Sequence, residues 1–390
     1  MSSKSLSVCI LCRNDQDPLR RALASVAPVA HQIVVCDTGS TDGSISLARS
    51  SGALVVERAW DDDFSAARNY ALAHAVGDWI LLLDADEELM PGGIAALQSA
   101  IKLSHVLAYR IPRLDLQRLP DQLTTDGVGE SGTWMLHPRL HRNGFGLRYR
   151  GRCHPQFVRP LKEVSAETGL KLSEAPVLLR HYGYINPVNL RSKLERGARL
   201  MRLELADRPG QPYYEIELGR TLMSLGDPSG VELLRKNAVE LWRRRAEPTP
   251  PLPLSALLLD YLLSAPPSET RLELPQNELE ALALRWFPRS APFHWHIARR
   301  QFERQEFSGS RRLMEVLWRM AGDQSYDREV SFDERILGDE LRLNLGLVCV
   351  RLTDLDAAEA HFKAVSTHGL HAEAAQRNLS VVLEIRRQLG

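Results

Sequence analysis

Short apolar runs alternate with helical patterns along the first hundred residues of the chain. The run at residues 79–83 (WILLL) is bounded by polar residues and is too short for a helix, so it predicts a strand buried on both faces. Further strands are expected at residues 5–12, 32–37 and 53–57, and helices at residues 18–26, 44–51, 64–76 and 92–103. Strands that alternate with helices in this way form a parallel sheet with crossover helices.

The pattern changes twice further along. Strand-like pieces with irregular loops begin near residue 106, which indicates a mixed extension of the sheet. Beyond about residue 187 strand patterns nearly vanish, and a small residue in one helix precedes an acid in the following turn by eight positions at three places. These pairs are Gly219 and Asp227, Ala298 and Glu306, and Gly346 and Asp354. Such spacing is typical of tetratricopeptide-type helix pairs, and a plain α-bundle is the alternative.

These patterns predict an α/β domain at residues 1–186 and an all-α helical-repeat domain at residues 187–390. The formal net charge of zero gives no reason to expect bulk binding to nucleic acid. No apolar run reaches the roughly 18 residues of a membrane span. The N-terminus lacks a signal-peptide pattern, so a cytoplasmic location is expected.

Acidic residues follow the ends of two predicted strands. Asp37 ends the strand at residues 32–37, and Asp84, Asp86 and Glu87 follow the run at residues 79–83. Ligands of open α/β sheets bind at the carboxyl ends of the strands. Carboxylates there suit Mg²⁺ or Mn²⁺ that bridges the phosphates of a nucleotide. The alternatives are an acidic cap on the following helix for the second group and a turn-forming residue for Asp37.

Four features of this half of the chain occur together. They are Arg13-Asn14 after the first strand, VVCDTGSTDGS, WDDDFSAARN and GDWILLLDADEEL. Together they resemble family-2 glycosyltransferases of the GT-A fold, a Rossmann-like mixed-sheet fold, and in particular the bacterial branch that appends tetratricopeptide-like helices. The resemblance covers roughly residues 5–200.

The resemblance implies a role for each matching residue. Binding of the nucleotide sugar is implied for Arg13, Asn14, Asp37, Asp63, Arg68 and Asp84. Asp86 and His181, in the sequence RHYGY, would hold the divalent metal, Mn²⁺ or Mg²⁺. One acid of the run at residues 61–63 is also expected to cap the helix that follows.

The chain departs from the family pattern at the residue expected to activate the acceptor. Related sequences carry G-x-x-H-E, whereas this chain has His154-Pro155-Gln156. His154 and Glu87 are therefore the candidate catalytic residues, and Asp126 or Glu130 could take the place of the missing acid.

The sequence thus predicts a glycosyltransferase of hexosyltransferase type that is inverting and metal-dependent. Its partners would be a nucleotide-diphosphate sugar and an acceptor, which could be a peptide, a protein, a glycan or a small molecule, docked on the helical domain. The alternative, motivated by the missing acid, is a catalytically degenerate glycosyltransferase-like domain that serves as a helical-repeat interaction scaffold.

Overall fold

A computed structural model describes residues 4–116, 132–183, 185, 187–265, 272–327 and 330–389. The chain forms two compact units, and each is described by itself. Residues 1–116 and 135–214 make up unit 1, and residues 117–134 and 215–390 make up unit 2. The predicted division at residue 186 stays a prediction.

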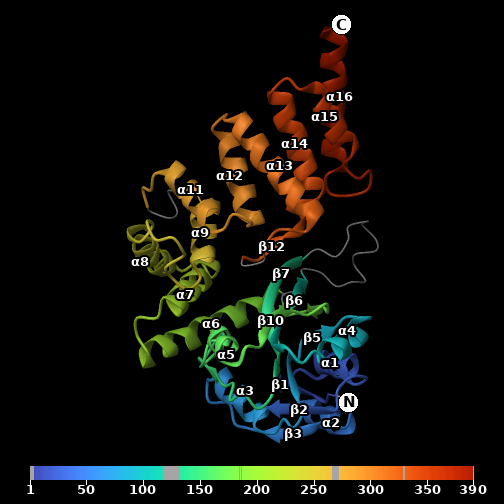
Figure 1. Ribbon diagram of the computed structural model, residues 1–390, viewed down its shortest axis with the longest axis vertical. Helices are drawn as coiled ribbons and strands as arrows, with labels where there is room; N and C mark the ends of the chain where they lie inside the picture. The colour runs from blue at the N-terminus through green and yellow to red at the C-terminus, as the bar shows by residue number, and fades with distance from the viewer. Residues whose placement is uncertain are drawn as a thin grey trace. The chain divides into compact units, whose positions relative to one another are not determined.

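Unit 1 is built on a mixed sheet with strand order β3-β2-β1-β4-β7-β6-β11-β5, and β10 pairs with β6 (Figure 1). The first four strands in this order are mutually parallel, whereas β7 runs antiparallel to β4. The strands of the unit are β1 (Leu6–Cys12), β2 (Gln32–Asp37), β3 (Leu54–Glu57), β4 (Trp79–Asp84), β5 (Glu87–Leu89), β6 (Val106–Leu116), β7 (Gly132–Arg142, whose first residues fall in unit 2), β8 (Tyr149–Arg150), β9 (Gln156–Phe157), β10 (Lys171–Glu174) and β11 (Leu179–His181).

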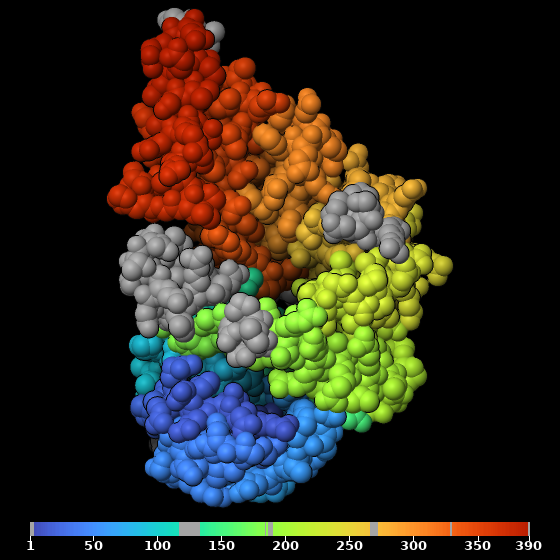
Figure 2. Space-filling view, turned by 180° about the vertical axis from the view of Figure 1, so that it is seen from behind, coloured from blue at the N-terminus to red at the C-terminus, as the bar shows by residue number. Residues whose placement is uncertain are grey.

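Helices cover both faces of this sheet, as alternating strands and helices require. The helices are α1 (Gln16–Val26), α2 (Ser44–Ser50), α3 (Phe64–Leu72), α4 (Gly93–Ala100), α5 (Leu161–Thr168) and α6 (Pro187–Asp207). In one core cluster, α1, α2 and α4 pack with Val8 and Ile10 of β1, and in another α3 packs with Cys9. The elements up to β3 present a continuous surface, coloured blue in Figure 2.

One strand was not expected from the sequence. Glu87, Glu88 and Leu89 form β5, which pairs antiparallel with β11 so that Glu87 lies opposite His181. A three-residue segment with two acids carries almost no strand signal of its own. Its strand conformation depends on hydrogen bonds to a segment about 90 residues later in the chain.

Unit 2 is mainly helical. The elements assigned mostly or wholly to it are α7 (Pro212–Ser224), α8 (Ser229–Arg243), α9 (Ser255–Ser264), α11 (Gln276–Trp286), α12 (Ala291–Glu303), α13 (Phe307–Asp323), β12 (Phe332–Asp333), the 3₁₀ helix η2 (Glu334–Leu337), α14 (Asp339–Arg351), α15 (Leu355–Lys363) and α16 (Ala372–Leu389). Over the described residues, no helix has the length and apolar character needed to cross a membrane.

The predicted small residues lie where consecutive helices approach closely. A Cβ on Gly219 of α7 would lie 3.0 Å from the carbonyl oxygen of Gly230 in α8. A Cβ on Gly346 of α14 would overlap the ring of Phe362 in α15. Asp354 caps α15 by accepting a hydrogen bond from the Ala357 N–H at 3.2 Å. These contacts are the helix-pair geometry expected for the repeats, and the predicted fold class, a mixed-sheet α/β domain followed by an all-α region, is confirmed.

Candidate active site

The predicted acids lie at the carboxyl ends of adjacent parallel strands. Asp37 ends β2 and Asp84 ends β4, and β1 lies between these two strands. Asp86 follows two residues after Asp84, just before β5. Because parallel strands end at the same edge of a sheet, the three carboxylates share the edge at which α/β proteins bind ligands.

Asp37 organises the loop that follows β2. Its Oδ1 accepts hydrogen bonds from the backbone N–H groups of Gly39 and Ser40 at 2.9 and 2.8 Å. Its Oδ2 is buried and has no hydrogen-bond partner among the described residues. A buried carboxylate oxygen without a partner is costly, so this atom fits a donor group from a ligand. The turn-forming interpretation accounts for only one of the two oxygens.

Asn14 fastens the end of β1 to the same loop. Its backbone adopts a left-handed conformation with φ of 54°, and its Oδ1 accepts a hydrogen bond from the Thr41 N–H at 2.7 Å. Its own N–H donates to Ser40 Oγ at 2.9 Å. The neighbouring Arg13 is exposed.

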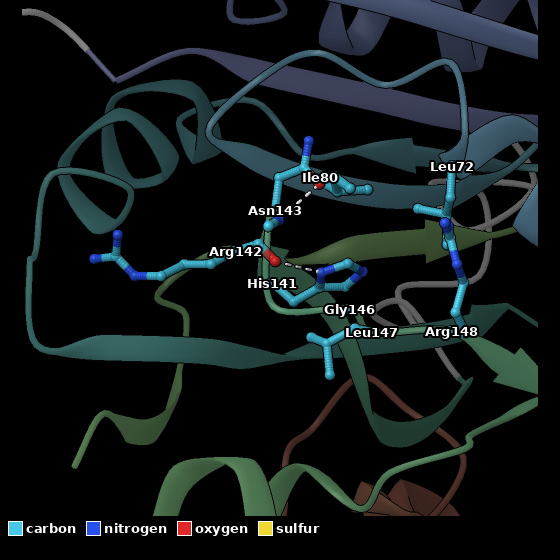
Figure 3. A pocket seen from close by; sticks show the side chains of 9 residues that line it. Leu72, Ile80, His141, Arg142, Asn143, Gly146, Leu147 and Arg148 are labelled. Atoms are coloured by element: carbon cyan, nitrogen blue, oxygen red, sulfur yellow. Dashed lines mark hydrogen bonds between the residues drawn. The ribbon is translucent and has the colours of Figure 1, made fainter. Parts of the chain in front are cut away.

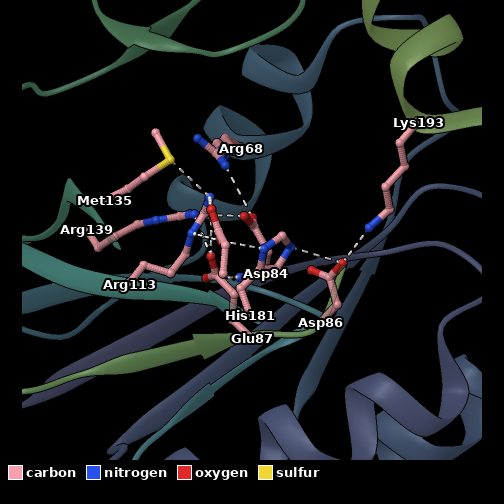
Figure 4. A network of polar contacts seen from close by, with 10 residues as sticks. Arg68, Asp84, Asp86, Glu87, Arg113, Met135, Arg139, His181 and Lys193 are labelled. Carbon is pink, nitrogen blue, oxygen red and sulfur yellow. Dashed lines mark hydrogen bonds and ion pairs between the residues drawn. The ribbon is translucent and has the colours of Figure 1, made fainter. Parts of the chain in front are cut away.

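A buried network of arginines and acids supports the turn after β4 (Figure 4). Arg139 Nη2 lies 2.8 Å from Asp84 Oδ2 and 2.7 Å from Glu87 Oε1. Arg68 of α3 reaches Asp84 Oδ1 at 3.2 Å, and Arg113 reaches Glu87 Oε1 at 3.2 Å. Burial would raise the pKa of Asp84, but Arg139 and Arg68 outweigh it and hold the pKa well below its usual range. Asp84 is therefore a fixed carboxylate.

Glu87 has a different environment from the one expected for a catalytic base. Its side chain has no exposed surface and contacts the guanidinium groups of Arg113 and Arg139. Its Oε2 also accepts a hydrogen bond from the Asp84 N–H at 3.0 Å. Both oxygens of the carboxylate are therefore held by groups of the protein. These contacts indicate that Glu87 shapes the turn rather than meeting the acceptor.

Asp86 and His181 face each other on the other side of this turn. His181 Nε2 lies 3.4 Å from Asp86 Oδ2, and His181 Nδ1 lies 2.7 Å from Asp115 Oδ1. Lys193 of α6 places its ammonium group 2.7 Å from the same Asp86 Oδ2. Burial lowers the pKa of His181, but its contacts with Asp115 and Asp86 raise it to about 9. The pKa of Asp86 is lowered, since these cationic partners outweigh its burial.

Two side chains could hold a metal here. A carboxylate that orients the far nitrogen of a histidine is the usual support for a metal-binding imidazole, and Asp115 supplies it for His181. The ammonium of Lys193 demonstrates that the position next to Asp86 Oδ2 accommodates a cation. Among the described residues no group of three or more His, Cys, Asp or Glu side chains forms a ready metal site. Asp86 and His181 would therefore share the ion with ligand oxygens, as Mg²⁺ sites commonly do.

The remaining predicted site residues are Asp63, His154, Asp126 and Glu130. Asp63 is the N-cap of α3 and accepts a hydrogen bond from the Ala66 N–H at 3.0 Å. His154 is exposed, with a left-handed φ of 47°, in the turn before β9. Asp126 and Glu130 lie outside the described residues.

Four residues of this site were missed by the sequence analysis: Arg113, Asp115, Arg139 and Lys193. The first three lie on the strands β6 and β7, where charged residues within largely apolar strands were a usable signal. Lys193 gave no signal, because a lysine on an amphipathic helix is usually solvated.

A separate cavity of about 170 Å³ lies near the start of β4 (Figure 3). Ile80 and its strand partner His141 line it, together with Asn143, whose N–H donates to the carbonyl of Asp78. Asp84 is at the opposite end of β4. This cavity is therefore distinct from the acidic edge.

Comparisons with known proteins find relatives of the same half of the chain. Residues 7–125 match the family model "Glycosyl transferase family 2". A TPR repeat-containing protein of Synechococcus elongatus is 33% identical over 250 residues, which cover 61% of this chain and 57% of that protein. An uncharacterized glycosyltransferase of Rickettsia typhi is 30% identical over 118 residues, or 30% of this chain and 40% of that protein.

Among solved structures, the mannosyltransferase PcManGT from Pyrobaculum calidifontis, in complex with GDP-Man and Mn²⁺, is 18% identical with a TM-score of 0.39. The match covers 73% of this chain and 87% of that one. The curated relatives named above are matched over 57% and 40% of their own lengths. Residues 7–125 of the chain therefore form a glycosyltransferase domain of family 2.

Proposed function

We propose that the chain transfers a sugar from a nucleotide-diphosphate sugar to an acceptor, with inversion and with a divalent metal. One observation carries the proposal. At a single sheet edge, a buried carboxylate oxygen of Asp37 lacks a donor, and Asp86 with His181 surrounds a position that accepts a cation. A nucleotide diphosphate presents both a hydrogen-bond donor on its nucleoside and a site for a cation on its phosphates.

Asp37 would recognise the nucleoside. The N–H groups of Gly39 and Ser40 hold Oδ1 and so fix the orientation of the carboxylate. Oδ2 has no partner among the described residues. An N–H of the base or an O–H of the ribose would complete its hydrogen bonding. Asn14 would hold the loop in the conformation that Asp37 requires.

Asp86 and His181 would hold Mn²⁺ or Mg²⁺. When bound, the ion would neutralise the diphosphate as it leaves. The protein's part is to orient its ligands: Asp115 fixes the ring of His181 so that Nε2 faces Asp86. His181 must give up the Nε2 proton to act as a ligand, so the ion would bind more weakly as the pH falls.

Asp84 would contact the sugar or the ribose rather than the ion. Its carboxylate is held between Arg68 and Arg139, yet its side chain remains 31% exposed. A carboxylate fixed in this way can accept a hydroxyl hydrogen bond without reorganising. Glu87, beneath it, would keep the arginines in place.

The acceptor needs a base on the side of the sugar opposite the diphosphate, because an inverting displacement is direct. We assign this role to His154, the exposed imidazole at the place of the family's G-x-x-H-E motif. Replacing it with alanine should lower transfer by roughly a hundredfold or more, the usual contribution of such a group. Binding of the nucleotide diphosphate should be unchanged.

Unit 2 would dock the acceptor. Its helix pairs expose Trp318, whose side chain is 37% exposed and stacks with the guanidinium of Arg342 at 4.9 Å. Exposed tryptophan and arginine are enriched where proteins meet their partners. Trp318→Ala should impair transfer to a peptide, protein or glycan acceptor while donor hydrolysis by water stays unchanged.

The test is a panel of nucleotide sugars, each incubated with the purified protein and Mn²⁺. Release of the nucleoside diphosphate from one donor, together with a thermal shift by that nucleotide, would support an enzyme. A thermal shift without release or transfer would favour the degenerate scaffold. The absence of both would overturn the proposal.

A further inference from the structure

Lys193 lies at the position that the proposed function assigns to the metal. Its ammonium is 2.7 Å from Asp86 Oδ2, while His181 Nε2 is 3.4 Å from that same oxygen. Figure 4 shows Lys193 reaching Asp86 from α6, on the side away from the arginine network. A divalent ion held by Asp86 and His181 would therefore need the carboxylate oxygen that Lys193 contacts.

Lys193, Asp86 and His181 all place polar atoms close to the backbone of Gly183. A Cβ at this residue would lie 2.6 Å from Lys193 Nζ and 2.7 Å from Asp86 Oδ2, and it would also overlap His181 Nε2. The three polar atoms thus surround one small volume beside the backbone of Gly183. A divalent ion in that volume would lie within a few ångströms of the ammonium group, and the two cations would repel each other strongly.

Among three basic residues of α6, Lys193 contacts Asp86, whereas Arg196 and Arg199 have other partners. Arg196, one turn later, contacts the ring of Phe64 at 5.8 Å, and Arg199 pairs with Asp62 at 2.5 Å. Arg196 therefore holds the helix against the first residue of α3, and Arg199 holds it against the segment just before α3. Lys193 is the member of this basic row whose charge reaches Asp86.

We propose that Lys193 is a built-in competitor of the divalent cation: it holds the cation position at Asp86 in the metal-free protein, and metal binding must displace it. The inference rests on the proposed function only for the identity of the metal site. A lysine in this role keeps Asp86 paired when no donor is present. It also sets the metal concentration at which the site fills.

The test measures Mn²⁺ binding to the full chain without nucleotide, by electron paramagnetic resonance of free Mn²⁺. Lys193→Met should bind Mn²⁺ roughly fivefold or more tightly than the wild type, the lower end of the coupling between competing ligands. Lys193→Arg, which keeps a cation at the same position, should bind Mn²⁺ as the wild type does.

Arg196→Gln is the matched control, since it removes the same charge from the same helix without breaking the pair to Asp86. Its Mn²⁺ affinity should change by less than about twofold if only long-range charge is lost, as expected for screened charges. Equal affinities of Lys193→Met and Arg196→Gln would overturn the proposal. If neither the wild type nor Lys193→Met bound Mn²⁺, the metal site itself would be overturned. Wild-type binding with no gain in Lys193→Met would overturn the lysine's role alone.

Discussion

Arg139 offers the sharpest test of the buried network under the active-site turn. Its side chain is 6% exposed and bridges Glu87, which has no exposed side-chain surface, to Asp84. Arg139→Met removes one partner and leaves a buried carboxylate behind, which costs about 3–5 kcal/mol for a broken buried pair. Arg113 remains 3.2 Å from Glu87, so the lower end, about 3 kcal/mol, is expected.

The expected loss in the free energy of unfolding can be measured by thermal unfolding and by hydrogen exchange. For a unit of about 200 residues, 3 kcal/mol corresponds to a fall in Tm of roughly 6–12 °C. Hydrogen–deuterium exchange of peptides from β4 and β7 should accelerate, since both strands belong to the network. This second readout assigns the loss to the sheet, even when the helices of unit 2 unfold separately.

Two further variants compare this buried network with an exposed ion pair and with the loss of both charges of the buried pair. Arg110→Met breaks an exposed pair with Glu174, in which each side chain is 49% exposed, so it should cost at most about 1 kcal/mol. Arg139→Met combined with Glu87→Met removes both charges of this pair and should recover part of the loss, because Arg113 keeps its contact with Asp115 whereas the Asp84 N–H loses its acceptor. If Arg139→Met cost no more than Arg110→Met, the account of the buried network would be wrong.

Three other predictions follow from single sites. Asp37→Ala should weaken nucleotide binding by about 1–3 kcal/mol in calorimetry; wild-type affinity would leave Asp37 as a turn residue. Gly346→Ala, whose Cβ would meet the Phe362 ring, should destabilise the helical unit by about 1–3 kcal/mol on thermal unfolding, whereas Gly322→Ala, with nothing within 4 Å, should not. Burial lowers the pKa of His141 to about 4, so the folded state loses stability as the pH falls from about 6.5 towards 4. His141→Phe should remove that part of the pH dependence; an unchanged difference between pH 7 and pH 4.5 would contradict it.

The parallel half of the sheet could be predicted from the sequence because its signals are local. The strand expected at residues 32–37 is β2, with the same bounds, and the apolar run at residues 79–83 is β4 extended by Asp84. Buried parallel strands are apolar throughout, and their ends are marked by polar residues. The predicted helix at residues 64–76 ends earlier, at Leu72, because a turn of backbone hydrogen bonds replaces its last part.

The supporting half of the site depends on contacts distant in sequence, so it could not be predicted in this way. β5 exists because Glu87 to Leu89 pair with β11, and Arg139 meets Asp84 across 55 residues of chain. Lys193 reaches Asp86 across 107 residues. Sequence patterns report periodicity within an element, and these pairings depend on how elements pack.

In the proposed function, this edge of the sheet binds a nucleotide-diphosphate sugar through a metal held by Asp86. The most direct measurement is release of the nucleoside diphosphate from the active donor, with and without Mn²⁺, by the wild type, by Asp86→Ala and by the exposed control Asp17→Ala. We expect Mn²⁺-dependent release by the wild type and by Asp17→Ala, and none by Asp86→Ala. Equal release by all three proteins, or release that does not depend on Mn²⁺, would contradict the proposed function.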